Sequence, residues 1–241
     1  MGDLVRKVFR VNYEQRSLEE IEEVAEGAAV MQEQHARDVL SMAETQIHEH
    51  AAGLTWVFTG EAMARACHAL CAEGRVWLVD PVDEPEPLAR AAALGRPAGV
   101  MQLLDRHARD GAAIAQRLGV PHLRLPDAIP DSPFEAVSIV DVPKWRELGL
   151  WWPQTRTLVV PEAVGTASAF AVGDGLVGVH PVLRAFGMAR LRRWEPELLL
   201  VGHGPPVAGS EATAALHEAL ARSRRDLPRL VAKLPALIRS G

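Results

Sequence analysis

The sequence predicts an α/β fold in which two β-sheets pack together and are flanked by helices. Strand and helix patterns alternate between residues 54 and 125, and short apolar runs separated by turn residues follow from 136 to 172. An apolar run at 198–201 and a helical pattern at 211–225 complete the order. Strand–helix units, a meander of short strands and a final strand and helix are typical of a two-sheet sandwich.

The composition is that of an ordinary globular protein. The chain has 241 residues, of which 48% are hydrophobic and 24% charged, which suits one domain or one domain with an appendage. The net charge of −5 argues against binding of nucleic acid. We also expect no membrane association, because no apolar run approaches the ~20 residues that span a bilayer. The first residues lack the apolar core of a secretory signal, so we expect a cytoplasmic protein.

The first 52 residues form an acidic zone that we expect to be separate from a main domain at 53–241. A weak alternation of apolar and polar residues at 7–13 predicts a short strand. Ser17 and Glu20 then form a capping-box pattern that opens a predicted helix, with one apolar seam, running to about His50. A helix of ~30 residues is long for a domain of this size. We therefore predict a packing arm, or a dimerisation arm that makes a homodimer.

The main domain is predicted to begin with a strand at 54–59 and a helix near 62–72. Cys67 and Cys71 would share one face of this helix, and we interpret them as buried helix residues without a zinc or redox role. The remaining elements are listed in chain order. Strands are predicted at 74–80, 99–104, 122–125, 136–140, 149–152, 157–160, 169–172 and 198–201, with helices ending at Leu94 and spanning 110–118 and 211–225.

Two histidines stand where apolar strands end in turns, which is where α/β folds build their sites. His107 lies in the segment Leu-Leu-Asp-Arg-His-Ala-Arg-Asp at 103–110, and His203 lies in a Gly-His-Gly turn after the apolar run at 198–201. With Asp80 at the end of an early strand, these segments resemble the first and last metal-binding motifs of the metallo-β-lactamase superfamily. The resemblance covers residues 54–220 and implies a four-layer αββα sandwich.

The aligned motifs show several departures from that family. In the first motif, Asp105 stands at the place of the first histidine and His107 keeps the second. Arg109 stands at the place of the aspartate, and Asp110 replaces the last histidine. Further on, an aspartate replaces the strand-edge histidine, a glutamate lies near the bridging aspartate, and the final histidine is intact. These three residues are Asp141, Glu162 and His203.

The resemblance implies a metal-dependent hydrolase with a degenerate metal site. His107, Asp110, Glu162 and His203 would hold one divalent ion, and Asp105 or Asp141 would be a further ligand or the base. Water activated by the ion would open an ester, thioester, lactone or phosphoester of an unidentified small molecule. A carboxylate-rich set suits manganese or iron better than a second zinc ion, so zinc, manganese and iron all stay open.

A catalytically inactive member of the fold is the alternative, and it would hold no metal. A guanidinium cannot ligate a metal, and Arg109 would pair with Asp105, Asp110 or Glu162 as a charged remnant of the site. The protein would then bind a small anion in a pocket around Arg109, or bind another protein through its N-terminal helix. Trp145 is predicted to line the pocket wall in either case.

Other motifs add little to either hypothesis. His48 and His50 are expected to interact with carbonyls at a helix end, and His180 is expected to have a loop or core role. The chain has no Gly-x-Ser-x-Gly elbow, phosphate-binding Walker loop or dinucleotide fingerprint, which excludes the mechanisms that depend on them.

Overall fold

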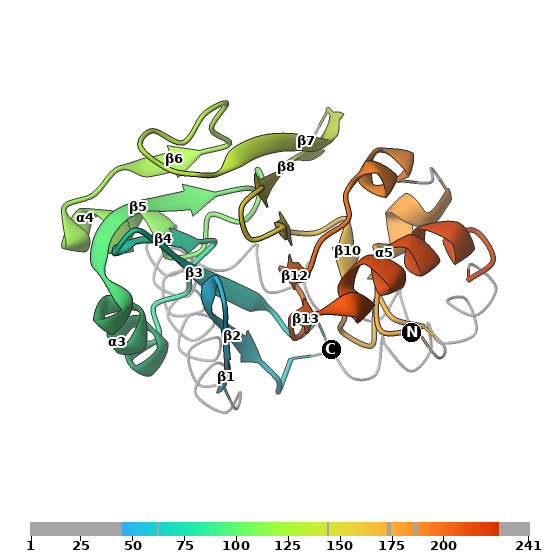
Figure 1. Ribbon diagram of the computed structural model, residues 1–241, viewed down its shortest axis with the longest axis horizontal. Coiled ribbons are helices and arrows are strands. Elements are labelled where there is room, and N and C mark those ends of the chain that lie inside the picture. The colour runs from blue at the N-terminus through green and yellow to red at the C-terminus, as the bar shows by residue number, and fades with distance from the viewer. Residues whose placement is uncertain (1–44, 62, 144, 173–174, 186–187, 227–241) are drawn as a thin grey trace, which may run out of the picture. The chain divides into compact units, whose positions relative to one another are not determined.

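The computed structural model describes residues 45–61, 63–143, 145–172, 175–185 and 188–226 (Figure 1). Most of the predicted N-terminal arm lies outside the described residues, so its helical seam and the homodimer stay predictions. Within the described residues, no helix is both long and apolar enough to cross a membrane.

The first sheet carries the N-terminal half of the described chain. Its antiparallel part comes first. The strands β5 (Arg96–Gln102) and β6 (His122–Arg124) then join in parallel, because two helices return the chain across one face of the sheet. The helices are α3 (Pro85–Leu94) and α4 (Gly111–Leu118). Within the described residues the sheet has six strands in chain order: β1 (Thr45–His50), β2 (Gly53–Phe58), β3 (Ala66–Ala72), β4 (Arg75–Val79), β5 (Arg96–Gln102) and β6 (His122–Arg124).

The second sheet is formed by the C-terminal half. Its strands β9 (Thr157–Val160) and β12 (Leu198–Val201) are parallel neighbours, and α5 (Ser210–Arg222) packs against its outer side. In the described part of the chain its order is β13 (Val207–Ala208), β12 (Leu198–Val201), β9 (Thr157–Val160), β8 (Trp145–Trp152) and β7 (Glu135–Val142). Shorter elements are the pair β10 (Val164–Gly165) and β11 (Gly178–Val179) and the 3-10 helices η1 (Pro181–Ala185) and η2 (Ala189–Arg193).

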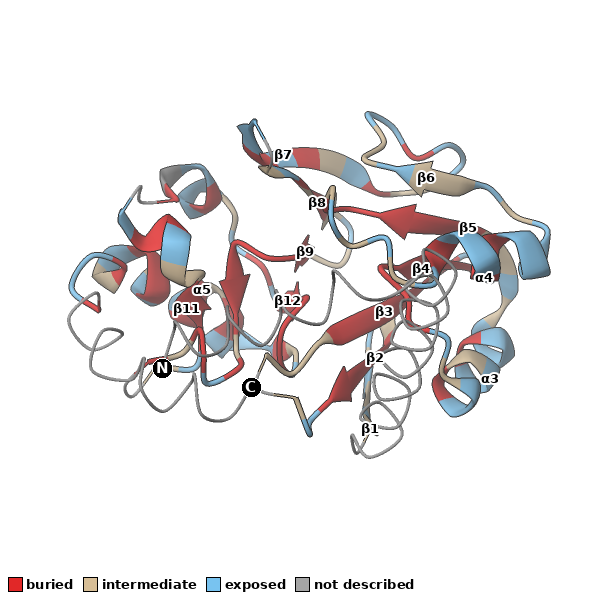
Figure 2. Ribbon diagram, turned by 180° about the vertical axis from the view of Figure 1, so that it is seen from behind, coloured by how far each residue is buried: buried red, intermediate tan, exposed pale blue. Residues whose placement is uncertain are grey.

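A continuous apolar core lies between the two sheets, and their central strands are almost wholly buried (Figure 2). Trp77 of the first sheet meets Phe134 edge to face, and Phe134 meets Trp152 of the second sheet in the same way, with ring centroids 5.1 and 5.2 Å apart. With helices outside both sheets, the layers run helix, sheet, sheet, helix. The predicted αββα sandwich is confirmed.

Three predicted elements are wrong. Residues 45–50 form strand β1, paired from Thr45↔Phe58 to His50↔Gly53, and not the end of a long helix. Residues 66–72 form strand β3, because a strand buried on both faces reads as a continuous apolar run that periodicity cannot separate from a helix. Residues 169–172 form no strand, since 169–170 lie in a turn and 171–172 are irregular.

A polar network of His50, Thr55 and His68 lies in the antiparallel part of the first sheet, with Thr55 and His68 fully buried. The Thr55 hydroxyl lies 3.0 Å from His50 Nε2 and 2.8 Å from His68 Nδ1. Burial lowers the pKa of His68 to about 3 and the pKa of His50, which also lies near His48, to about 4. Both imidazoles are therefore neutral in the folded protein at neutral pH.

We expect this network to make the fold sensitive to acid. Between the folded pKa near 3 and the unfolded value of 6.5, the unfolded chain binds the extra proton at His68, so the free energy of unfolding falls as pH falls. The loss should be roughly 1.4 kcal/mol per pH unit below about pH 6. Urea unfolding at pH 7 and pH 5 measures it. The His68→Asn variant should show a shallower pH slope, and an unchanged slope would contradict the assignment to His68.

Candidate metal centre

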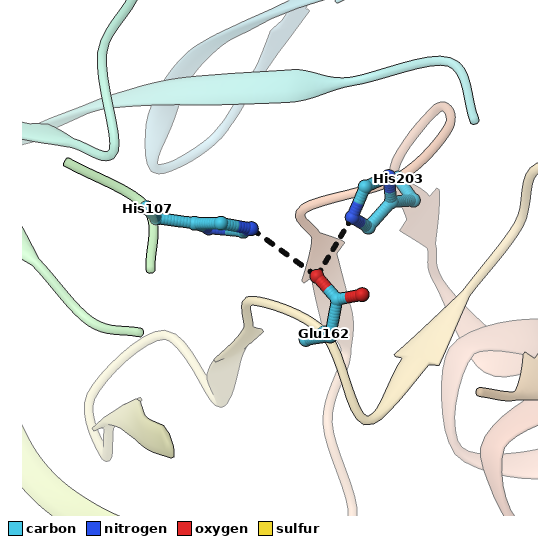
Figure 3. Close-up of side chains that lie close together, drawn as sticks. All are labelled: His107, Glu162 and His203. Carbon is cyan, nitrogen blue, oxygen red and sulfur yellow. Dashed lines mark hydrogen bonds and ion pairs between the residues drawn. The ribbon is translucent and has the colours of Figure 1, made fainter. Parts of the chain in front are cut away.

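Three side chains converge at the edge where the two sheets meet: His107, Glu162 and His203 (Figure 3). Glu162 Oε2 lies 3.1 Å from His107 Nε2 and 2.9 Å from His203 Nε2. The three candidate ligand atoms lie within 4.8 Å of one another, and each side chain is no more than 11% exposed. The structure thus brings together three of the four predicted metal ligands.

The parallel pairing of β9 and β12 places two of the three residues side by side. Val160 pairs with Val201, so Glu162 and His203 each follow their strand by two residues. Gly202 makes this approach feasible, because a Cβ at that position would lie 2.0 Å from the Pro161 carbonyl oxygen. The next residue, Gly204, has a φ of +98°, which only glycine adopts readily. The Gly-His-Gly sequence is therefore a requirement of the turn.

The first sheet supplies the third residue and joins the second sheet at the same place. The chain after β5 hydrogen-bonds to β8, with Leu148 N donating to Leu103 O at 2.9 Å and Asp105 N donating to Arg146 O at 3.0 Å. This connection directs His107, which comes shortly after Asp105 in the chain, toward Glu162 and His203. The ligand cluster is thus built from both sheets.

The partners of the two imidazoles set their tautomers. His203 Nδ1 lies 3.0 Å from the Met63 carbonyl oxygen, which can only accept, so Nδ1 carries a proton. His107 Nδ1 lies 3.1 Å from Asp80 Oδ2, which favours the same tautomer. Both Nε2 atoms are then left to face Glu162 Oε2. Metal-binding histidines are held in this way, with the other ring nitrogen donating to a carboxylate or a backbone carbonyl.

The electrostatics of the cluster favour positive charge at its centre. Burial alone would lower the pKa of His107, but hydrogen bonds with Asp80 and Glu162 outweigh it and raise that pKa. Burial alone would raise the pKa of Glu162, but hydrogen bonds with His107, His180 and His203 hold it far below its usual range. The donor set therefore fits a divalent cation.

Two further residues belong to the site although no sequence motif marks them. His180, after β11, places Nε2 3.2 Å from Glu162 Oε1. Glu147 in β8 is fully buried and accepts hydrogen bonds from the Glu162 and Ala163 amides through Oε1, at 2.9 and 2.8 Å. Its Oε2 accepts from Trp145 Nε1 at 3.1 Å, and burial raises the pKa of Glu147 to about 7.

The other predicted acidic residues lie outside this cluster. Asp105 Oδ2 accepts from the Arg146 amide at 2.9 Å, and Asp110 Oδ2 accepts from the Asp83 amide at 2.8 Å. Asp141 is exposed and lies 3.5 Å from Arg146 Nε. None of the three belongs to the group of candidate ligand atoms found among the described residues.

Trp145 lies beside the cluster as predicted, whereas Arg109 does not make the predicted contacts with carboxylates. We expected Arg109 to pair with nearby carboxylates, but its guanidinium donates to the carbonyls of Ala66 and Asp80, at 2.8 and 2.7 Å. Because Arg109 is in the left-handed region, with a φ of +38°, its side chain leaves the loop toward β3 and β4. Trp145 packs edge to face on His180 with ring centroids 4.9 Å apart, so it does lie beside the cluster.

Asp80→Asn should weaken metal binding by changing the tautomer of His107. Asp80 Oδ1 accepts from the Leu103 amide at 3.0 Å, so an asparagine keeps its oxygen there and presents its NH₂ to His107 Nδ1. The proton then moves to Nε2, which can no longer ligate a cation. We expect zinc affinity to fall about 10–100-fold. Chelator competition measures this loss, and the exposed Asp127→Asn serves as control. Equal affinities would contradict the tautomer argument.

Comparison with solved structures agrees with the sandwich described above. The similar structures include VMB-1, with a TM-score of 0.50 and 8% identity over 76% of this chain and 97% of that one. The DIM-1 metallo-β-lactamase has a TM-score of 0.48 and 12% identity over 76% and 98%, and a metallo-β-lactamase from Pontibacter korlensis has 0.42 and 11% over 73% and 93%.

The chain has the metallo-β-lactamase fold. At these identities the similarity establishes the fold alone, so the site must be argued from its own geometry. No protein-family model matches the chain, and no curated protein sequence does.

Proposed function

We propose that this protein is a metal-dependent hydrolase whose centre holds one divalent cation on His107, Glu162 and His203. The observation that carries the proposal is the convergence of two oriented Nε2 atoms and one carboxylate oxygen in a buried cluster. Two histidines and a glutamate are a donor set of catalytic zinc sites, and two histidines and one carboxylate also bind non-haem iron.

His107, Glu162 and His203 would be three protein ligands, which would leave room on the ion for water and substrate. When bound, the cation supplies Lewis-acid chemistry and lowers the pKa of water, which suits hydrolysis of an ester, thioester, lactone or phosphoester. The chain's own residues orient the ligands: Asp80 fixes the ring of His107, the Met63 carbonyl fixes the ring of His203, and Glu147 holds the turn that carries Glu162.

The site is degenerate relative to a two-metal centre. Asp105, Asp110 and Asp141 engage backbone amides or a neighbouring arginine, so the converging donors are enough for one ion. Asp105 or Asp141 as base stays a prediction. The inactive alternative has less support, because Arg109 is bound to backbone carbonyls and does not pair with the cluster.

Elemental analysis of protein purified without chelators, and after loading with zinc, manganese or iron, tests the proposal. We expect about one ion per chain in the wild type and in Asp110→Ala, and its loss in His203→Ala. A hydrolase screen of the loaded protein with ester, thioester, lactone and phosphoester substrates then follows. Absence of stoichiometric metal under every loading condition would overturn the proposal, and loss of metal in Asp110→Ala would refute the three-ligand assignment.

A further inference from the structure

We propose that His180 is a positioning residue that holds Glu162 so that only one carboxylate oxygen faces the cation. The inference rests on the proposed function, and it deepens that function by assigning a role to a fourth side chain of the centre, one that is 14% exposed. His180 Nε2 lies 3.2 Å from Glu162 Oε1, whereas His107 and His203 both approach Oε2. The two oxygens of one carboxylate thus have separate partners.

The tautomer of His180 is opposite to that of the two candidate ligands. Its Nδ1 accepts the Val182 amide hydrogen at 3.3 Å, so the ring proton is on Nε2 and is donated to Glu162 Oε1. A nitrogen that donates its hydrogen to a carboxylate has no lone pair for a metal. His180 is therefore a donor to Glu162, whereas His107 and His203 use Nδ1 as donor and keep Nε2 for ligation.

Three contacts fix this ring relative to the centre. The backbone amide of His180 donates to the carbonyl oxygen of Ala163, the neighbour of Glu162, at 2.9 Å. Trp145 packs edge to face on one side of the imidazole and Phe170 on another, with centroids 4.9 and 5.5 Å away. Phe170 also stacks on the ring of His203 at 5.0 Å and 21°. One phenyl ring thus contacts both a candidate ligand and its positioning residue.

The consequence is monodentate binding by Glu162. With Oε1 held by His180, Oε2 alone would be offered to a cation bound by His107 and His203. A carboxylate free to rotate would offer both oxygens and occupy a further coordination position. His180 therefore keeps that position open for water or substrate, as a catalytic site requires.

Two variants distinguish a positioning role of His180 from a role in packing alone. His180→Phe keeps an aromatic ring between Trp145 and Phe170 but removes the donor, and His180→Gln places an amide NH₂ close to the position of Nε2. We measure the zinc affinity of each full-length protein by chelator competition and count its imidazole and carboxylate donors by X-ray absorption. The thermal unfolding of the metal-free proteins monitors the fold.

We expect His180→Phe to lose about 10–100-fold in zinc affinity with a similar metal-free Tm, and His180→Gln to lose less than about threefold. The number of imidazole ligands should be two in the wild type and in both variants. If both variants lose one imidazole, His180 is a ligand and the positioning role is wrong. Unchanged affinity in His180→Phe overturns it as well. A wild type that binds no zinc overturns the proposed function, and the inference with it.

Discussion

Glu147→Ala is expected to destabilise the protein by about 3–5 kcal/mol, because it leaves two buried amides and a partly buried indole without an acceptor. The Glu162 and Ala163 amides and the Trp145 indole all donate to this one carboxyl group, which is fully buried. Each unsatisfied buried donor costs roughly 1–3 kcal/mol. Glu147→Gln should lose less, since its oxygen still accepts from the two amides and only the indole meets an NH₂ group.

Urea unfolding of the wild type and both variants measures these losses. Glu135→Ala is the matched control, because Glu135 is exposed on the neighbouring strand β7, and it should change stability by less than about 0.5 kcal/mol. A loss no larger in Glu147→Ala than in Glu135→Ala would show that the Glu162 turn does not depend on this carboxyl group.

Gly202→Ala is expected to abolish tight metal binding as well as destabilise the fold. Its Cβ would lie 2.0 Å from the Pro161 carbonyl oxygen, and this neighbour is backbone, so the ends of β9 and β12 must move apart. Overpacking of this kind costs about 1–3 kcal/mol. Because Glu162 and His203 directly follow the two contacting residues, the same displacement separates two of the three donors.

Gly119→Ala distinguishes general destabilisation from damage to the centre. Gly119 ends α4 with a φ of +66° and has open space around its missing Cβ, so alanine there costs about 1–2 kcal/mol from backbone strain alone. We expect it to lower the Tm and to bind zinc with wild-type affinity. Gly202→Ala with wild-type zinc affinity would contradict the argument from the close approach of β9 and β12.

Most of the fold and three residues of the candidate site could be predicted from the sequence, because short stretches of the chain indicate them. His203 lies in a Gly-His-Gly turn and His107 in a segment after an apolar run, and Glu162 is indicated by its place in the motifs that resemble the metallo-β-lactamase superfamily. His180 and Glu147 have no such marks. Their roles depend on the pairing of β10 with β11 and on the contact of Leu104 with Glu147 across the two sheets, which no short window of sequence contains.

The wrong predictions have the same cause, which is that contacts between distant segments of the chain are not visible in a short stretch of sequence. The segment from Ala66 to Ala72 is rich in alanine, which favours a helix, but pairing with β2 and β4 makes it a central strand. The pairing expected for Arg109 assumed that side chains close in sequence meet in space. The left-handed backbone of Arg109 turns its guanidinium toward the carbonyls of Ala66 in β3 and of Asp80, which follows β4, and a linear alignment cannot show this.

The candidate ligands come from both halves of the sandwich, with His107 following β5 and the other two following β9 and β12. The turn that carries His203 is also tied to the first sheet, since Ala66 N donates to Gly202 O at 2.8 Å and the Met63 carbonyl accepts from the imidazole. An ion held here would act as a further cross-link between two sheets that are already joined at this edge by backbone hydrogen bonds and elsewhere by apolar side chains. Chelation should then loosen the join between the sheets before either sheet loses its own hydrogen bonds.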